Sequence, residues 1–144
     1  MTWLIYALVT AFLYAVFDVF VRLSSDKISP ITGAVWMNTV AALTVSIFFI
    51  YNYIIGTKLL EVKQHGWLFA TLAGISVGLL SMTFIRVFAE GANVALGITV
   101  VRAGGIVIAT LIGVLILKED ITLRTAFGIL LSVVGVYMVI AGRL

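Results

Sequence analysis

The chain of 144 residues has no cysteine, one proline and one histidine, and only 10% of its residues are charged. The absence of cysteine excludes disulfides, zinc–cysteine sites and thiol nucleophiles. The single histidine, His65, follows Gln64 in a polar connector, where a solvated side chain is the ordinary interpretation. No nucleophile–base pair, metal-ligand cluster or phosphate loop is visible, so we expect neither an enzyme nor a bound cofactor. The nine Lys and Arg residues form no basic run, and we expect no nucleic-acid partner.

Apolar residues dominate what is present. They make up 63% of the chain, and the mean hydropathy is +1.26. Soluble domains carry about 25% charged residues and cannot hide this much apolar surface in a core of this size. Lipid is the solvent that accepts such a surface. We therefore predict an all-α, polytopic membrane protein with a single transmembrane domain over residues 1–144.

Five apolar stretches reach the roughly 20 residues that a helix needs to cross about 30 Å of hydrocarbon. Ser29-Pro30 predicts one helix start, because it places a capping side chain before a proline at the first helical position. The shortest break runs from Glu90 to Asn93, and one long bent helix there, giving four spans, is the alternative. The five predicted spans cover residues 3–23, 30–55, 67–87, 94–117 and 122–140.

The ends of these spans carry two further signals. No basic residue precedes the first span and no small-residue cleavage site follows it, so we expect a retained helix rather than a signal peptide. Aromatic side chains that prefer the membrane–water boundary lie near several span ends. They are Trp3, Tyr6, Tyr51, Tyr53, Trp67 and Tyr137.

Positive charge divides equally between the two sides of the membrane. The side of the N-terminus receives Lys58, Lys63, Lys118 and Arg124, and the opposite side receives Arg22, Lys27, Arg86 and Arg143. The positive-inside rule therefore gives no preferred orientation. We favour dual insertion, with copies entering the membrane both ways up. The alternative is that an insertion partner or the N-terminal amine decides the orientation.

Small residues form three stripes at helical spacing. Close packing of such residues holds helices together in lipid, where no hydrophobic force acts between them. The stripes are Gly74 with Gly78, Gly105 with Ala109 and Gly113, and Gly128 with Ser132 and Gly135. We expect the first two to pack within the chain. The third is a candidate either for packing within the chain or for a dimer contact.

Polar side chains from four predicted spans converge on one depth. At about 1.5 Å per residue, Arg102 and Asn38 lie about 12 Å from the side opposite the N-terminus, Ser81 about 9 Å and Asp18 about 8 Å. Ionisable groups at such depths are costly and are candidates for function. The structural alternative is an ion pair of Asp18, either with Arg102 or with Arg22 one turn further along.

Arg102 is the hardest of these residues to explain as structural. A guanidinium at this depth suits an anionic or zwitterionic solute, because it binds carboxylate or phosphate in a bidentate way. Gly104 and Gly105 follow it and are a candidate helix hinge. Tyr14 and Trp36 could line the same cavity, or equally face lipid or pack within the protein.

The closing segment carries a family resemblance. An apolar helix, the turn Lys118-Glu119-Asp120 and a helix with Gly128 and Gly135 seven residues apart resemble the end of the EamA-type repeat of the drug/metabolite transporter superfamily. The opening span followed by Ser29-Pro30 is similar as well. The resemblance covers nearly the whole chain as one five-helix repeat. Ile106 stands near a position where the family often has proline.

The resemblance implies transport by two repeats of opposite topology, an arrangement that an odd number of spans produces on duplication. A single repeat is too small to act alone, so the resemblance implies a homodimer, antiparallel in the membrane. The chain is also similar to the small multidrug resistance proteins, whose membrane glutamate aligns with Tyr14 here, with Asp18 one turn further along. That difference puts proton-coupled cation export by the same residue in doubt. The pair Gly128 and Gly135 is similar to that branch's dimer contact.

Together these features favour a homodimeric secondary transporter that moves a small metabolite by alternating access in the cell membrane of a prokaryote. Arg102 would bind an anionic group, and Asp18 would pair with it or carry a coupling proton. Asn38, Ser81, Tyr14 and Trp36 complete the expected substrate site. The alternatives are a flippase-like subunit for a phosphate-bearing lipid carrier and a non-transporting half of a heterodimeric complex.

Overall fold

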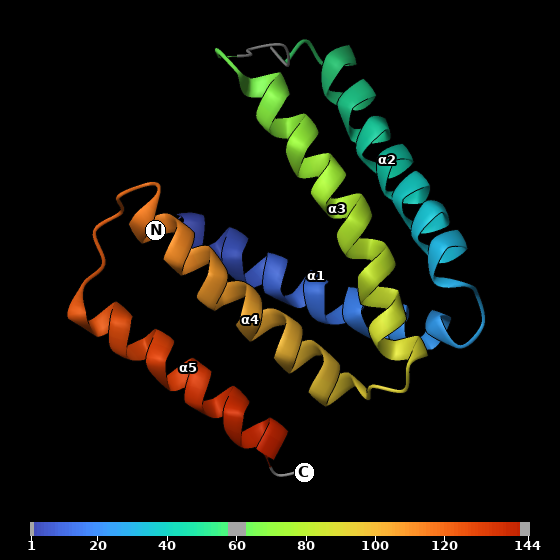
Figure 1. Cartoon of the computed structure of the whole chain (residues 1–144). Helices are drawn as coiled ribbons and strands as arrows, with labels where there is room; N and C mark the ends of the chain where they lie inside the picture. The colour runs from blue at the N-terminus through green and yellow to red at the C-terminus, as the bar shows by residue number, and fades with distance from the viewer. Residues whose placement is uncertain (1, 58–62, 142–144) are drawn as a thin grey trace. The chain divides into compact units, whose positions relative to one another are not determined.

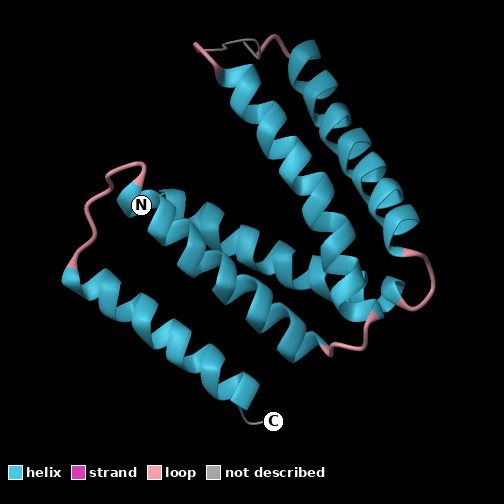
Figure 2. Ribbon diagram, in the orientation of Figure 1, coloured by secondary structure: helices cyan, strands magenta, loops and turns pink. Residues whose placement is uncertain are grey.

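The computed structural model describes residues 2–57 and 63–141. This part of the chain forms α-helices joined by turns and contains no strand (Figure 2). The predicted all-α fold is confirmed, and each helix begins and ends within two residues of its predicted span. The helices are α1 (Thr2–Ser25), α2 (Pro30–Ile54), α3 (Gly66–Ala89), α4 (Val94–Leu115) and α5 (Leu123–Ala141).

Local capping explains where two of the helices start. The Ser29 hydroxyl accepts a hydrogen bond from the Thr32 N–H at 3.3 Å, and Pro30 is the first residue of α2. Asn93 Oδ1 accepts from the Leu96 N–H at 2.9 Å and starts α4. Gly91, at φ +97°, adopts a backbone conformation that side-chain-bearing residues rarely take. The segment from Glu90 to Asn93 therefore separates two helices, and one long bent helix is not formed there.

The helices suit a bilayer. Among the described residues α1, α2, α3 and α4 are each long and apolar enough to cross a membrane, and α5 carries a shorter apolar stretch, Leu123–Gly135. Large apolar side chains lie exposed along the helices, as at Phe12 (68%) and Phe48 (64%). Lipid covers such surfaces at no cost, whereas water would not. The chain is a multi-pass membrane protein, and the choice between five and four spans stays a prediction.

The chain divides into two compact units, Met1–Gly91 and Ala92–Leu144. In the first unit α2 and α3 lie side by side in antiparallel directions, and α1 packs against both (Figure 1). Its buried apolar side chains are all near one end of the α2–α3 pair, the end formed by the start of α2 and the last turns of α3. We call this the packed end. It contains Val21, Ala34, Phe84, Ile85 and Phe88.

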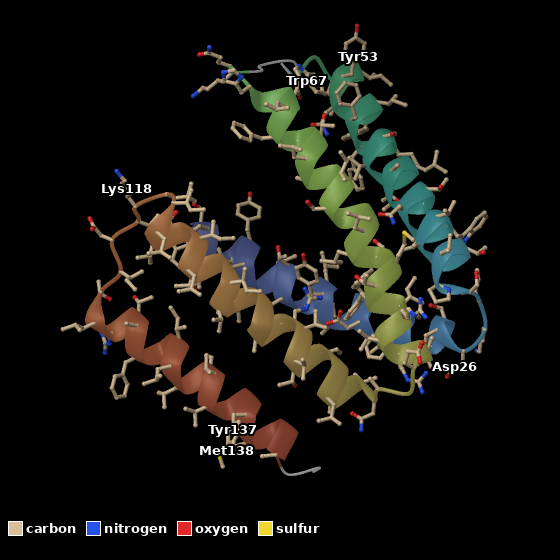
Figure 3. The ribbon with its side chains drawn as sticks, viewed as in Figure 1. Asp26, Tyr53, Trp67, Lys118, Tyr137 and Met138 are labelled. Atoms are coloured by element: carbon tan, nitrogen blue, oxygen red, sulfur yellow. The ribbon has the colours of Figure 1, made fainter. Side chains whose placement is uncertain are left out.

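The other half of the α2–α3 pair is almost wholly exposed. We call residues 43–55 of α2 and 67–77 of α3 the exposed end. Figure 3 places Tyr53 and Trp67 there and Asp26 at the packed end. Both rings are 67% exposed, in keeping with their predicted position at the membrane boundary.

The second unit is a hairpin of α4 and α5. Its turn holds Lys118 at φ +56°, and the Glu119 N–H donates to the Gly113 carbonyl oxygen at 3.0 Å. A Cβ on Gly113 would lie 2.7 Å from Glu119 Oε2, so the turn folds back onto this glycine. Thr122 then starts α5, where its hydroxyl accepts from the Thr125 N–H at 3.2 Å.

The other predicted stripes behave differently. At Gly74, Gly78 and Gly105 no described atom of the same unit lies within 4 Å of where a Cβ would stand, so these glycines make no close contact inside their own units, and their packing within the chain stays a prediction. Gly128 and Gly135 are equally open within the hairpin, and the α5 stripe stays a candidate either for packing within the chain or for a dimer contact. Ser132 donates its hydroxyl proton to the Gly128 carbonyl oxygen at 3.0 Å and is exposed.

Candidate functional site

Three phenylalanines join α1 to α3 at the packed end. Phe17 stacks on Phe84 with ring centroids 6.1 Å apart and planes 10° apart, and Phe84 meets Phe88 edge-on at 5.1 Å. Phe17 precedes Asp18, and Phe84 lies one turn after Ser81. The aromatic contact therefore fixes the part of the first unit in which both polar residues lie.

A hydrogen bond between side chains joins α2 to α3 in the same region. Asn38 Nδ2 donates to Ser81 Oγ at 3.1 Å, across 43 positions of sequence. Ser81 is only 2% exposed, and Asn38 is half-buried. The depth calculation from the sequence brought these two side chains to one layer, and the structure brings them into contact.

Two small residues of α2 leave room for α3 to pack closely near this bond. A Cβ on Gly33 would lie 3.2 Å from Ile85 Cδ1 and 3.2 Å from Ile28 Cγ2. Ala34 beside it is 3% exposed, so α2 presents two small residues to α3. Small residues at helix contacts let membrane helices approach closely, and polar side chains then bridge them.

Asp18 is buried on α1, at 3% exposure. Val21 and Ser25, three and seven positions further along, are the other buried residues of this helix, which gives α1 one buried face. Arg22 forms its ion pair with Asp26 and also donates to Ser25 Oγ at 3.1 Å. The printed partners of the Arg22 guanidinium thus lie toward the helix end, and the ion pair of Asp18 stays a prediction.

The predicted residues Trp36 and Tyr14 also lie in the first unit. Trp36 is 69% exposed, as expected for a ring that faces lipid. Tyr14 is 49% exposed and meets the Phe17 ring edge-on at 6.5 Å. Arg102 belongs to the second unit, where it is half-buried beside the buried Ala103. Gly104 and Gly105 lie inside the continuous helix α4, so their role as a hinge stays a prediction.

Sequence reasoning missed the aromatic cluster. Ser81, Phe84, Ile85 and Phe88 follow the i, i+3, i+4, i+7 spacing of a buried helix face. Because α3 is apolar on every side, this spacing does not distinguish the buried face from the others in the sequence. Ser81 was the only residue that marked the buried face. Gly33 was missed for a related reason, because its neighbours across the helix contact come from a distant part of the sequence.

The chemistry available at the packed end is hydrogen bonding and charge. Within residues 2–57 and 63–141 no three His, Cys, Asp or Glu side chains gather as metal ligands. The buried or half-buried polar groups of the first unit include the Asp18 carboxylate, the Asn38 amide and the Ser81 hydroxyl. Such a set can hold a small polar solute without reacting with it.

Comparison with known proteins adds one finding. The model of the EamA-like transporter family matches residues 1–141 of the chain. No curated protein and no solved structure matches it.

Proposed function

The chain belongs to the EamA-like transporter family, and from this premise we propose that it is a secondary transporter subunit that moves a small metabolite by alternating access. Membership in this family implies membrane transport of small solutes. The proposal adds the mode of transport, a homodimer as the working unit, and a substrate site that includes Asp18, Asn38 and Ser81. It involves transport without a chemical reaction.

The hydrogen bond between Asn38 and Ser81 carries the proposal. Polar side chains such as Asn and Ser hydrogen-bond across helices in membranes, whereas a carboxylate at lipid depth is costly and is a candidate for function. Here the bond between the Asn38 and Ser81 side chains lies in the same packed end as a carboxylate that is 3% exposed. Polar groups held together at this depth mark solute or ion pathways in membrane proteins.

We further propose that Arg102 binds an anionic group of the solute. Its guanidinium is fixed in charge and offers paired donors to a carboxylate or phosphate. The Asp18 carboxylate has two alternative proposed roles: it carries a coupling proton, or it pairs with Arg102.

The homodimer is proposed with its two copies antiparallel. The described cations on the two predicted sides are three each: Lys63, Lys118 and Arg124 against Arg22, Lys27 and Arg86. Lys58 and Arg143, the fourth of each set, lie outside the described residues. A balanced charge allows both orientations. The open glycines of α5 are the proposed contact between copies.

A thermal-shift screen tests the substrate site. The purified protein is screened against amino acids, organic acids, nucleobases and quaternary amines, because ligand binding raises apparent stability by mass action. We expect stabilisation by an anionic or zwitterionic compound, its loss in Arg102→Ala, and an unchanged dimer. Arg124→Ala, at the start of α5, is the matched control. Unchanged affinity in Arg102→Ala would remove Arg102 from the site.

Labelling of a single cysteine tests the orientation. Gln64→Cys introduces the only thiol of the chain in the connector before α3. We expect a membrane-impermeant maleimide to label about half of the molecules in intact cells. Complete labelling, or none, would show one fixed orientation and contradict dual insertion.

A further inference from the structure

The side-chain amide of Asn38 is fixed in one orientation by its surroundings. Nδ2 lies 2.8 Å from the Ala34 carbonyl oxygen and 3.1 Å from Ser81 Oγ. A backbone carbonyl oxygen accepts hydrogen bonds and never donates them. The amide atom facing Ala34 must therefore be the nitrogen, and a flipped amide would set two acceptor oxygens against each other.

The Ser81 hydroxyl restricts the amide further. Ser81 Oγ lies 2.6 Å from the Val77 carbonyl oxygen and donates its only proton there. Toward Asn38 it can then only accept. Both N–H protons of the Asn38 amide and the O–H proton of Ser81 are thus used within the protein.

The Asn38 carbonyl oxygen, Oδ1, is what the pair leaves available. No described group donates to Oδ1, and no side-chain oxygen or nitrogen of the described residues is both fully buried and without a partner. Oδ1 is therefore not fully buried and keeps some accessible surface. An oxygen that can only accept hydrogen bonds discriminates strongly between solutes. A solute that places another acceptor against it leaves two desolvated oxygens unpaired.

We propose that Asn38 Oδ1 selects solutes that carry an N–H or O–H donor, and that Ser81 is the positioning residue that holds the amide in this orientation. The inference rests on the proposed transport function and names the substrate class of that site. A primary ammonium group satisfies Oδ1, whereas a trimethylammonium group of the same charge does not. Charge and hydrogen bonding can thus be separated experimentally.

Matched pairs of zwitterions test this selection in the intact protein. The pairs are glycine with glycine betaine, leucine with its N,N,N-trimethyl derivative, and phenylalanine with its N,N,N-trimethyl derivative. Each pair keeps the carboxylate and the positive charge and removes every N–H. Any further ligand from the wider screen is compared with its fully N- or O-methylated analogue. Dissociation constants are measured by thermal shift over a concentration series.

We expect the donor-bearing member to bind about tenfold more tightly in the natural protein, the effect of one hydrogen bond to a charged or well-desolvated group. Asn38→Leu should remove this preference. Asn52→Leu should retain it, because Asn52 makes the same bond to its own helix, Nδ2 to the Phe48 carbonyl oxygen at 2.8 Å, at the exposed end. Ser81→Ala should weaken the preference, which keeps the inference testable if Asn38→Leu does not fold.

The outcomes separate the two proposals. Equal binding of both members, or a preference that survives Asn38→Leu, overturns the assignment of Oδ1 and leaves transport standing. A ligand with no N–H or O–H donor overturns it as well. If Asn38→Leu changes the proportion of dimer and leaves the solute selectivity unchanged, Oδ1 belongs to a contact between copies. That result overturns the assignment of Oδ1 to a solute. Failure of every compound in the pairs and in the wider screen to bind contradicts the proposed function itself.

Discussion

The two ends of the α2–α3 pair are both mainly apolar with scattered polar residues, and they differ in their contacts. At the exposed end the polar side chains bond to their own helix, as Asn52 does to Phe48 and Ser76 does to Leu72. At the packed end Asn38 bonds to its own helix at Ala34 and also reaches Ser81 on the neighbouring helix. The difference teaches that a polar residue in an apolar helix is satisfied locally by default. Contact between helices needs a close approach, which Gly33 permits only at the packed end.

The largest expected contrast concerns a buried and an exposed phenylalanine of α3. Phe88 is 0% exposed and Phe69 is 66% exposed. Phe88→Ala should destabilise the protein by about 3 kcal/mol, the low end of the range for such truncations, because helices separated in lipid stay in apolar surroundings. Phe69→Ala should cost less than about 0.5 kcal/mol. Unfolding in mixed micelles measures both, and equal losses would refute the existence of a packed end.

Replacement of a glycine at each end of the α2–α3 pair should give the next largest difference in stability. Gly33→Leu should cost about 1–3 kcal/mol, since a side chain there is forced against Ile85. Gly74 has no described atom within 4 Å of a Cβ position, so Gly74→Leu should be neutral or stabilising in the monomer. Unfolding midpoints of the two variants give the test. Destabilisation of the dimer alone by Gly74→Leu would reveal a partner on that face.

The smallest expected contrast concerns two serines of α3. Ser81→Ala removes an acceptor of a bond between helices, which is worth about 0.6 kcal/mol on average in membrane proteins. Ser76 donates only to Leu72 of its own helix, and Ser76→Ala should change stability by less than about 0.3 kcal/mol. A double-mutant cycle of Ser81→Ala with Asn38→Ala should recover a coupling of the size of the single loss. Additive effects would mean that the bond contributes nothing.

Helix positions were predictable because apolar length and turn chemistry are local properties. Ser29-Pro30 caps α2 as predicted. The predicted break from Glu90 to Asn93 separates α3 from α4, and the structure shows Asn93 as the cap of α4. The shared level of Asn38 and Ser81 followed from depth, since residue counts along two antiparallel helices fix which side chains lie at one level. Their contact did not follow from it. The family was recognised from the closing hairpin and is the one whose model matches the chain.

Contacts that depend on helix rotation and approach were not predictable. Depth says nothing about which way a side chain points, so Trp36 was grouped with Asn38 although its ring is exposed. Arg22 could reach Asp18 or Asp26 at equal sequence distance, and the sequence offered no means to choose. Glycine spacing indicates that a close approach is possible, and at Gly74 and Gly78 the described residues of the first unit make none.

Access from water to the packed end tests the central claim most directly. The chain has no cysteine, so Asn38→Cys and Thr44→Cys each introduce a single thiol. At 1.5 Å per residue the two positions lie about 12 Å and about 15 Å from the nearer end of α2, and so at similar depth. A transport site at Asn38 predicts that a charged thiol reagent modifies the Asn38→Cys variant in the bilayer and that bound solute slows this reaction. The Thr44→Cys variant should stay unmodified in lipid. Equal protection of both thiols from the reagent would contradict a solute site at the packed end.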